Sequence, residues 1–264
     1  MHAPAQRTIP LELLLAAYRS GIFPMSDSRD DEDVYWVEPR ERAILPLDGF
    51  RCSRSLAKAI RQDRFRVTCD AAFAEVIHAC AAPRPGHPGT WISRRIAESY
   101  HALHAAGHAH SIECWQDGEL VGGLYGVAFD RVFCGESMFS RRTDASKVAL
   151  GWLVVLLRRA GFLLLDCQFM TEHLASLGAV EIERDEYLRL LAEATAAPAA
   201  QSLPEAYSAV LSAAAGAASA GVGEGEGVSV GEGLAEGAAR GAADGASAVS
   251  CPGKLIAQSL THTS

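Results

Sequence analysis

Three short apolar segments follow one another in the middle of the chain, and they constrain its fold more than any other feature. They span residues 111–115, 120–129 and 132–135. Asp117 and Gly118 separate the first two, and an Asp-Gly pair between two apolar segments is a strong β-hairpin signal. A long apolar helix at 144–160 and a buried strand at 163–166 follow. An antiparallel meander with helices on its faces is typical of an α+β fold.

The segments around this meander alternate between helical and extended patterns. We predict helices at 10–18, 53–63, 71–80, 93–107 and from residue 185, and strands at 34–37, 43–45, 67–69 and 180–182. Ser53 and Asp144 stand where helix N-caps belong, and Thr171 begins a short helix. Gly161 is expected to end the long helix.

The composition changes near residue 200. Between residues 201 and 250, 32 of 50 residues are Gly, Ala or Ser. Such a segment buries too little apolar surface to offset the entropy lost on ordering it. We therefore expect residues 197–264 to form a low-complexity, disordered tail, whose end at 254–264 either docks on the core or hangs free.

The composition of the whole chain excludes several classes of protein. With 49% hydrophobic and 21% charged residues, it is that of a globular protein. No apolar run reaches the roughly 20 residues that a membrane span needs, and the N-terminal residues lack the pattern of a signal peptide. A formal net charge of −8 argues on average against a strongly basic nucleic-acid binder.

Neither the cysteines nor the histidines form a metal-binding pattern. The 7 cysteines include no CxxC pair, which indicates reduced thiols in a cytosolic protein rather than a zinc ribbon or a disulfide framework. His101 and His104 are one helical turn apart, but no carboxylate or thiol completes a ligand set. Ordinary polar and packing roles are therefore favoured over a metal site.

Polar and aromatic residues gather at three predicted strand ends, at 89–93, 134–140 and 166–168. Asp166 follows an apolar run, and a carboxylate at the end of a buried strand must find a partner or take up a proton. Gln168 lies two residues further on, and therefore on the same face of the strand. This pair is either structural, with Asp166 capping the next turn, or part of a functional site.

A basic cluster contrasts with the acidic average. Residues 51–66 hold six Arg or Lys residues against one acid. Arg54, Lys58 and Arg61 share one helical face because they are spaced by four and three residues. This face is either a solvated surface or a phosphate-binding patch, whose signature is a steep salt dependence.

The meander followed by a helix also suits an N-acyltransferase core of the acetyl-CoA type. That fold cradles the pyrophosphate of its donor on a glycine-containing loop before a helix, where free backbone N–H groups bind anions. Here residues 140–146 contain two arginines, but no glycine lies between Gly135 and Gly151. We therefore expect an acyl donor other than coenzyme A.

Eight blocks of sequence, in order between residues 11 and 194, match one bacterial enzyme family. They are AYRSGIFP at 17–24, GTWI at 89–92, GHAHSIE at 107–113, LVGGLYG at 120–126, FCGESMFS at 133–140, DASK at 144–147, DCQ at 166–168 and HLASLGA at 173–179. On these blocks the chain resembles the leucyl/phenylalanyl-tRNA–protein transferases. The low-complexity tail lies outside the match.

The resemblance implies a fold, a reaction and partners. It implies a small N-terminal α/β domain, residues 1–68, and an acetyltransferase-like mixed sheet flanked by helices, residues 69–196. The implied reaction moves Leu, Phe or, less well, Met from aminoacyl-tRNA to an acceptor protein that begins with Arg or Lys, and creates a destabilising N-terminus. No cofactor is implied. We expect a cytoplasmic monomer that does not contact a membrane and that binds tRNA through the cluster at 51–66.

The resemblance also assigns roles to residues. Asp166 would orient Gln168 near the reacting amine, and Glu136 is the candidate partner of the acceptor's basic first residue. A side-chain amide is not a base at neutral pH, so Gln168 positions the amine, and Asp166, a water or the substrate takes the proton. The donor side chain would enter an apolar pocket. Its matching residues are Leu124, Phe133, Met138, Leu150 and Leu153, which the hydrophobic pattern alone would assign to the core.

One position departs from the family pattern. Well-known members have Trp after the Phe-Pro pair, and this Trp and the one that matches Trp91 enclose the terminal adenine of the tRNA. Here the residue after Phe-Pro is Met25. A thioether still packs on a base, but a base–aromatic stack is worth about 1–3 kcal/mol. We therefore expect a weaker or differently balanced adenosine site.

Two other functions stay open at this point. The first is an acetyl-CoA-dependent N-acetyltransferase with the same core fold, which coenzyme A and not Phe-tRNA would stabilise. The second is a non-catalytic module that binds tRNA or degradation signals, which would bind charged tRNA without transferring its amino acid.

Overall fold

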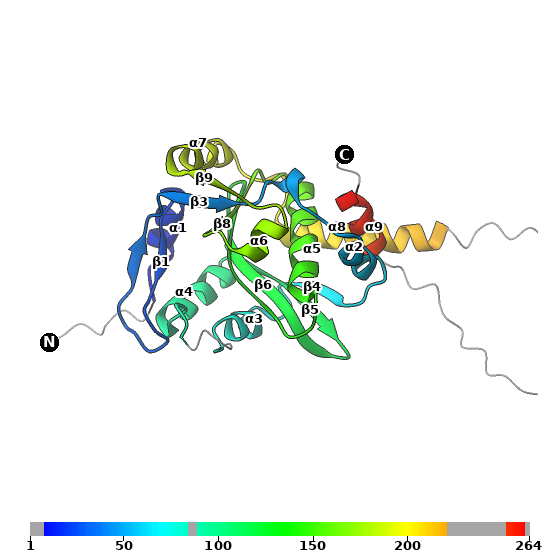
Figure 1. The fold of residues 1–264 in the computed structure, drawn as a ribbon, viewed down its shortest axis with the longest axis horizontal. Coiled ribbons are helices and arrows are strands. Elements are labelled where there is room, and N and C mark those ends of the chain that lie inside the picture. Colours follow the sequence, from blue (N-terminus) through cyan, green and yellow to red (C-terminus); the bar gives the residue numbers. More distant parts are fainter. Residues whose placement is uncertain (1–7, 84–88, 221–251, 262–264) are drawn as a thin grey trace, which may run out of the picture.

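Seven strands form one sheet in the middle of the molecule, and helices cover both of its faces (Figure 1). The computed structural model describes residues 8–83, 89–220 and 252–261. The strands are β3 Glu41–Ile44, β4 Arg66–Cys69, β5 Ala109–Gln116, β6 Glu119–Phe129, β7 Val132–Ser140, β8 Leu164–Gln168 and β9 Val180–Glu183. Their order is β4-β5-β6-β7-β8-β3-β9. β7 and β8 run parallel and the other neighbours in this sheet are antiparallel, which confirms a mixed α and β fold.

The predicted hairpin joins β5 to β6. Asp117 and Gly118 both have positive φ angles, of 52° and 82°, as the two central residues of a tight hairpin turn require. Gly126, near the middle of β6, allows a close approach, because a Cβ there would lie 2.4 Å from a ring carbon of Phe133 on β7. The meander β5-β6-β7 therefore forms as its sequence predicts.

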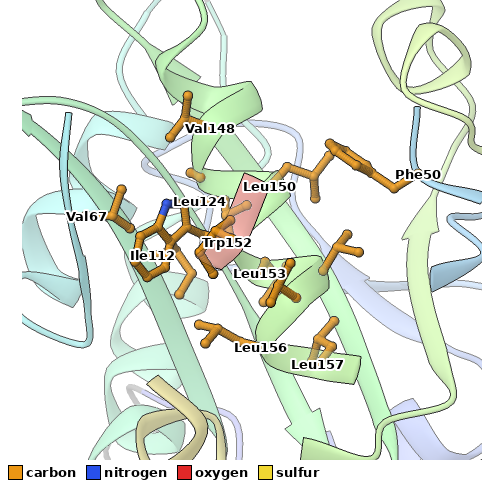
Figure 2. Close-up of a cluster of buried hydrophobic side chains, with 14 of the residues drawn as sticks. Phe50, Val67, Ile112, Leu124, Val148, Leu150, Trp152, Leu153, Leu156 and Leu157 are labelled. Carbon is orange, nitrogen blue, oxygen red and sulfur yellow. The ribbon is translucent and has the colours of Figure 1, made fainter. Parts of the chain in front are cut away.

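Two apolar cores lie on the two faces of the sheet. The helices are α1 Leu11–Arg19, α2 Arg54–Arg61, α3 Phe73–Cys80, α4 Arg94–Ala105, α5 Ala145–Ala160, α6 Glu172–Ser176, α7 Arg184–Thr195, α8 Leu203–Ala220 and α9 Pro252–Thr261. Leu124 belongs to the core under α5, and Tyr125 to the core under α3 and α4, because successive residues of a strand face opposite sides. Figure 2 shows how Trp152, Leu153 and Leu156 of α5 fill the first core.

The helix termini confirm most of the predicted caps. The side chains of Ser53 and Thr171 accept hydrogen bonds from the backbone N–H groups of Leu56 and Leu174. Gly161 ends α5 with a φ of 80°. The prediction that Asp144 caps α5 is wrong.

Asp144 precedes α5 in a left-handed conformation, with a φ of 69°, and its side chain makes no capping hydrogen bond. A capping residue needs an extended backbone to aim its side-chain oxygen at the first N–H groups of the helix. Its carboxylate instead lies 3.5 Å from Lys147 Nζ.

The N-terminal part contributes to two sheets. β1, Phe23–Met25, pairs with β2, Tyr35–Val37, in a separate two-stranded sheet. β3 lies between β8 and β9, and β4 is an edge strand of the main sheet. The predicted domain division at residue 68 therefore falls inside β4, within one sheet.

The prediction of a disordered tail needs correction for two segments. Residues 203–220 form α8, in which Leu203 and Val210 are buried, and residues 252–261 form α9, in which Ile256 and Leu260 are buried. Alanine is the best helix former, so an Ala-rich segment folds when a few apolar residues give it a surface to pack on. Residues 252–261 thus dock on the core; residues 221–251 and 262–264 lie outside the described part.

Candidate active site

A cavity of about 750 Å³ opens where β7, β8 and the first turns of α5 meet. β1, β6, α6 and the loop around Trp91 complete its wall. Eight of the ten residues predicted for catalysis and substrate binding line it: Met25, Trp91, Leu124, Glu136, Met138, Leu150, Leu153 and Gln168. Positions far apart in sequence therefore meet at one place.

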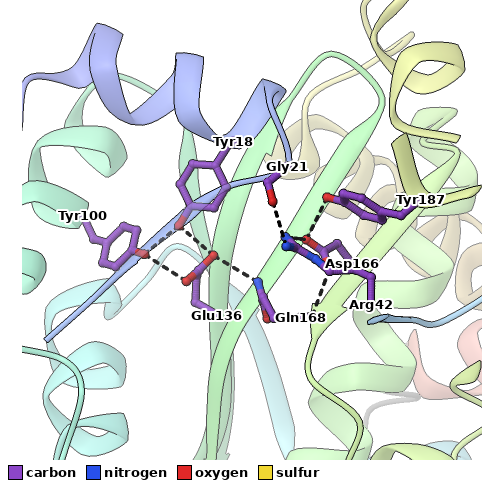
Figure 3. Close-up of polar contacts among 8 residues, drawn as sticks. All are labelled: Tyr18, Gly21, Arg42, Tyr100, Glu136, Asp166, Gln168 and Tyr187. Atoms are coloured by element: carbon purple, nitrogen blue, oxygen red, sulfur yellow. Dashed lines mark hydrogen bonds and ion pairs between the residues drawn. The ribbon is translucent and has the colours of Figure 1, made fainter. Parts of the chain in front are cut away.

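Phe133 and Asp166 are the two predicted residues that do not line this cavity. Phe133 is fully buried in the core under α5, where its ring occupies the space beside Gly126. Asp166 is also 0% exposed and lies beside Gln168, on the side of Arg42 and Tyr187 (Figure 3). Phe133 therefore belongs to the core of the sheet, and Asp166 is separated from the cavity by its neighbours.

Asp166 is held by a set of buried donors (Figure 3). Arg42 Nε donates to Asp166 Oδ1 at 2.8 Å and Arg42 Nη2 to Oδ2 at 2.5 Å. The hydroxyl of Tyr187 donates to Oδ2 at 3.1 Å, and the backbone N–H of Gln168 to Oδ1 at 2.9 Å. Arg42 Nη1 also donates to the carbonyl oxygen of Gly21. Burial acts to lower the pKa of Arg42, but the adjacent Asp166 carboxylate outweighs it and holds that pKa above its ordinary value.

This arrangement fixes the backbone of Gln168. Gln168 has a φ of 55°, a left-handed conformation that is uncommon for a residue other than glycine. The hydrogen bond from its N–H to Asp166 helps to stabilise that conformation at the end of β8. Asp166 therefore contacts Gln168 through the main chain.

Glu136 receives three hydrogen bonds at the base of the cavity. The hydroxyl of Tyr18 donates to Oε1 at 2.8 Å, that of Tyr100 to Oε2 at 2.9 Å, and Gln168 Nε2 to Oε1 at 3.3 Å. Burial raises the pKa of Glu136 to about 7, although the two tyrosine hydroxyls lower it. The carboxyl group therefore changes its charge near neutral pH, next to the side chain of Gln168.

Met25 and Trp91 lie close together on the wall of the cavity. The backbone N–H of Ser26, which follows Met25, donates to the carbonyl oxygen of Trp91 at 3.3 Å. Trp91 also lines a second cavity of about 460 Å³, together with Tyr35 of β2. A planar group that entered here would meet the thioether and aromatic rings.

The predicted tRNA-binding residues lie elsewhere. Arg54, Lys58 and Arg61 are exposed on α2, outside the cavity. In the part of the chain that the structure describes, no cluster of His, Cys, Asp and Glu could hold a metal ion. The same part contains no helix that is long and apolar enough to cross a membrane.

Sequence reasoning missed four residues of the site: Tyr18, Arg42, Tyr100 and Tyr187. Arg42 directly precedes the apolar residues of a predicted strand, and a cation at such a position is a weak sign of a buried ion pair. Tyr18 and Tyr100 looked like ordinary core residues of helices, since nothing in the pattern shows that their hydroxyls reach a carboxylate.

Comparisons with known proteins decide the family. Residues 44–192 match the family model described as leucyl/phenylalanyl-tRNA protein transferase, and residues 7–40 match the model of its N-terminal domain. A leucyl/phenylalanyl-tRNA–protein transferase from Novosphingobium aromaticivorans is 60% identical over 256 residues, which are 97% of this chain and 97% of that protein. The chain belongs to the leucyl/phenylalanyl-tRNA protein transferase family.

Other relatives agree. The transferase from Rhizorhabdus wittichii is 62% identical over 70% of this chain and 75% of its own length, and the one from Zymomonas mobilis is 60% identical over 69% and 68%. A solved structure described as "The structure of L-PGS from Bacillus licheniformis" covers 62% of this chain and 61% of its own, with 16% identity and a TM-score of 0.32, too low to assign a fold. This transferase is an aminoacyltransferase whose donor is aminoacyl-tRNA, as the resemblance implied.

Proposed function

We propose that this transferase moves Leu or Phe, and less well Met, from aminoacyl-tRNA to the N-terminal Arg or Lys of acceptor proteins. One observation carries the proposal: the wall of a mainly apolar cavity includes the hydrogen-bonded pair of Glu136 and Gln168. The apolar wall suits the donor side chain, and the polar end suits a charged acceptor.

The donor side chain is proposed to lie between Leu124, Met138, Leu150 and Leu153. Leu124 and Met138 face each other across β6 and β7, and the two leucines come from one side of α5. Such a wall favours γ-branched or benzyl side chains, and rejects β-branched ones by a clash of roughly 1–3 kcal/mol. The terminal adenosine would then reach Met25 and Trp91.

Glu136 is proposed to bind the basic first residue of the acceptor. A cation near a carboxyl group favours its charged form, so an arriving Arg or Lys would lower the pKa of Glu136 from about 7 and ionise it. Tyr18 and Tyr100 would then stabilise the anion through the hydrogen bonds that they already make. A neutral first residue would leave the partly buried carboxyl group of Glu136 without a cationic partner.

The chemical step needs positioning rather than activation, because the donor is already an ester. The α-amine nitrogen of the acceptor attacks the ester carbonyl carbon, the C–N bond forms, and the bond to the ribose oxygen breaks. With Nε2 of Gln168 committed to Glu136, the amide oxygen of Gln168 is proposed to accept an N–H of the amine. Asp166 does not face the cavity, so the proton passes to water or to the leaving ribose oxygen.

The exposed cations Arg54, Lys58 and Arg61 are proposed to bind backbone phosphates of the tRNA. We further propose that the enzyme works as a monomer in the cytoplasm, where charged tRNA and new proteins are available.

The test offers the full-length chain radiolabelled Phe-tRNA with acceptors that begin with Arg, Lys or Ala. We expect label on the first two acceptors and none on the third. Absence of label from all three, with binding of Phe-tRNA retained, would favour the non-catalytic module. Label from acetyl-CoA instead would favour the acetyltransferase.

A further inference from the structure

The last helix, α9, is fixed in place beside α2 (Figure 1). Ile256 and Leu260 turn into the core and are 0% and 4% exposed. A Cβ added to Gly253 would lie 1.9 Å from the carbonyl oxygen of Ile60, so only glycine allows α9 to approach α2 this closely. The N–H of Gly253 donates to Asp63 Oδ1 at 2.9 Å. These contacts hold α9 at one position on α2.

Two cavities lie where α2 and α9 meet, and we call them together the α2–α9 groove. The first, of about 560 Å³, is lined by Cys52, Arg54, Ala57, Lys58, Arg61, Gln62 and Thr261. The second, of about 330 Å³, is lined by Ala57, Arg61, Lys254, Ala257, Gln258 and Thr261. Four of these lining residues are exposed cations, and none of them is acidic. The lining of the groove is therefore positive, although the Asp63 carboxylate lies close by at Gly253.

A groove lined by one sign of charge concentrates ligands of the opposite sign. Arg and Lys are the side chains that most often contact nucleic-acid phosphates. We propose that α9 is part of the tRNA-binding surface, and that Lys254 contacts a backbone phosphate beside those bound by Arg54 and Lys58. This inference rests on the proposed function, since it extends the tRNA surface assigned to α2.

The helix α5 connects the groove to the candidate active site. Leu150 and Leu153 of α5 line the active-site cavity. Between them, Gly151 faces Ile60 of α2 and Leu260 of α9, each of which would lie 3.3 Å from a Cβ at that position. The two helices that form the groove therefore pack directly against the helix that lines the active-site cavity.

The helix α9 lies beyond the part of the chain that defines the family. The family model ends at residue 192, whereas the Novosphingobium relative matches 97% of this chain. Lys254, the one cation among residues 252–261, thus lies outside the residues that the family model matches. The groove would give this transferase a phosphate contact outside that matched part.

The test measures Kd for Phe-tRNA by fluorescence anisotropy over a series of salt concentrations, with the full-length chain. Lys254→Gln is compared with Arg189→Gln, which removes the same charge from α7, where Arg189 is 60% exposed. We expect Lys254→Gln to reduce the slope of log Kd against log salt by about 0.7–0.9, as for one lost phosphate contact. Lys254→Arg should restore the slope, and Arg189→Gln should leave it unchanged.

A second readout separates this inference from the proposed function. Phe esterified to adenosine alone carries no phosphate that could reach the groove, so Lys254→Gln should transfer Phe from it with unchanged kcat/KM. Equal salt slopes for Lys254→Gln and Arg189→Gln would contradict the proposal that Lys254 contacts a phosphate of the tRNA. Failure of the unmodified chain to transfer Phe from either donor would overturn the proposed function, while the salt slopes would still decide whether α9 binds tRNA.

Discussion

Arg42 and Asp166 form a buried ion pair in which two nitrogens of the guanidinium face two oxygens of the carboxylate, at 2.8 and 2.5 Å. Their side chains are 2% and 0% exposed. Removing one partner leaves a buried charge without compensation, which costs about 3–5 kcal/mol. We expect Arg42→Met to lower the free energy of unfolding by this amount, measured by urea denaturation.

The double variant Arg42→Met/Asp166→Leu is the control. It removes both charges, so it should recover most of the lost stability while the orientation of Gln168, and with it the transfer rate, stays impaired. A single variant as stable as the unmodified chain would contradict the role given to this pair.

The pH dependence of stability should report on Glu136. Burial raises its pKa to about 7 from an ordinary value of 4.5, so between these pH values the folded chain holds a proton there that the unfolded chain has already released. The stability that Glu136 contributes is therefore present below about pH 4.5 and is lost as the pH rises through about 7, by at most about 3 kcal/mol. Urea unfolding of the unmodified chain and of Glu136→Gln at a series of pH values measures this loss. Parallel curves for the two proteins would contradict it.

Met25→Trp should strengthen the adenosine site. A Trp at this position would line the cavity together with Trp91. A stack between an adenine base and an aromatic ring adds about 1–3 kcal/mol to the binding free energy. We expect the KM for Phe-tRNA to fall about fivefold or more, with Met25→Leu as the control of similar volume. An unchanged KM for Met25→Trp would show that the adenine binds elsewhere.

The docking of α9 can be tested by stability alone. Leu260 is 4% exposed and packs against Gly151 of α5. Leu260→Ala should therefore lower the free energy of unfolding by about 2–5 kcal/mol. Gln258→Ala, on the exposed side of the same helix, should change it by less than about 0.5 kcal/mol. Equal values for the two variants would mean that α9 does not pack on the core.

How far the sequence predicts this protein depends on how local each feature is. The Asp117–Gly118 turn and the caps at Ser53 and Thr171 were predicted because a few neighbouring residues decide them. The cap predicted at Asp144 is wrong, because the backbone there is left-handed where it leaves the turn after β7. α8 was missed because the contacts that stabilise it are made with distant residues of α5.

The same contrast holds inside the site. Asp166 and Gln168 were found from the strand end that they share, but Arg42 lies 124 positions away from Asp166 in sequence. The hydrophobic pattern cannot separate Leu150, which lines the cavity, from Phe133, which fills the core, because both are apolar residues of regular elements. The family resemblance predicted an apolar pocket, and the structure shows which of the predicted residues line the cavity.

The central claim is that the cavity beside Glu136 and Gln168 holds the donor amino acid, and filling the cavity tests it most directly. Met138 lines the cavity opposite Leu124, so Met138→Trp should occupy the space that a Phe or Leu side chain would take. The measurement is single-turnover transfer from Phe-tRNA and Leu-tRNA to an Arg-initiated acceptor, with the Kd for tRNA measured in parallel. We predict that transfer is lost from both donors while the Kd is retained; transfer at the unmodified rate would contradict the claim.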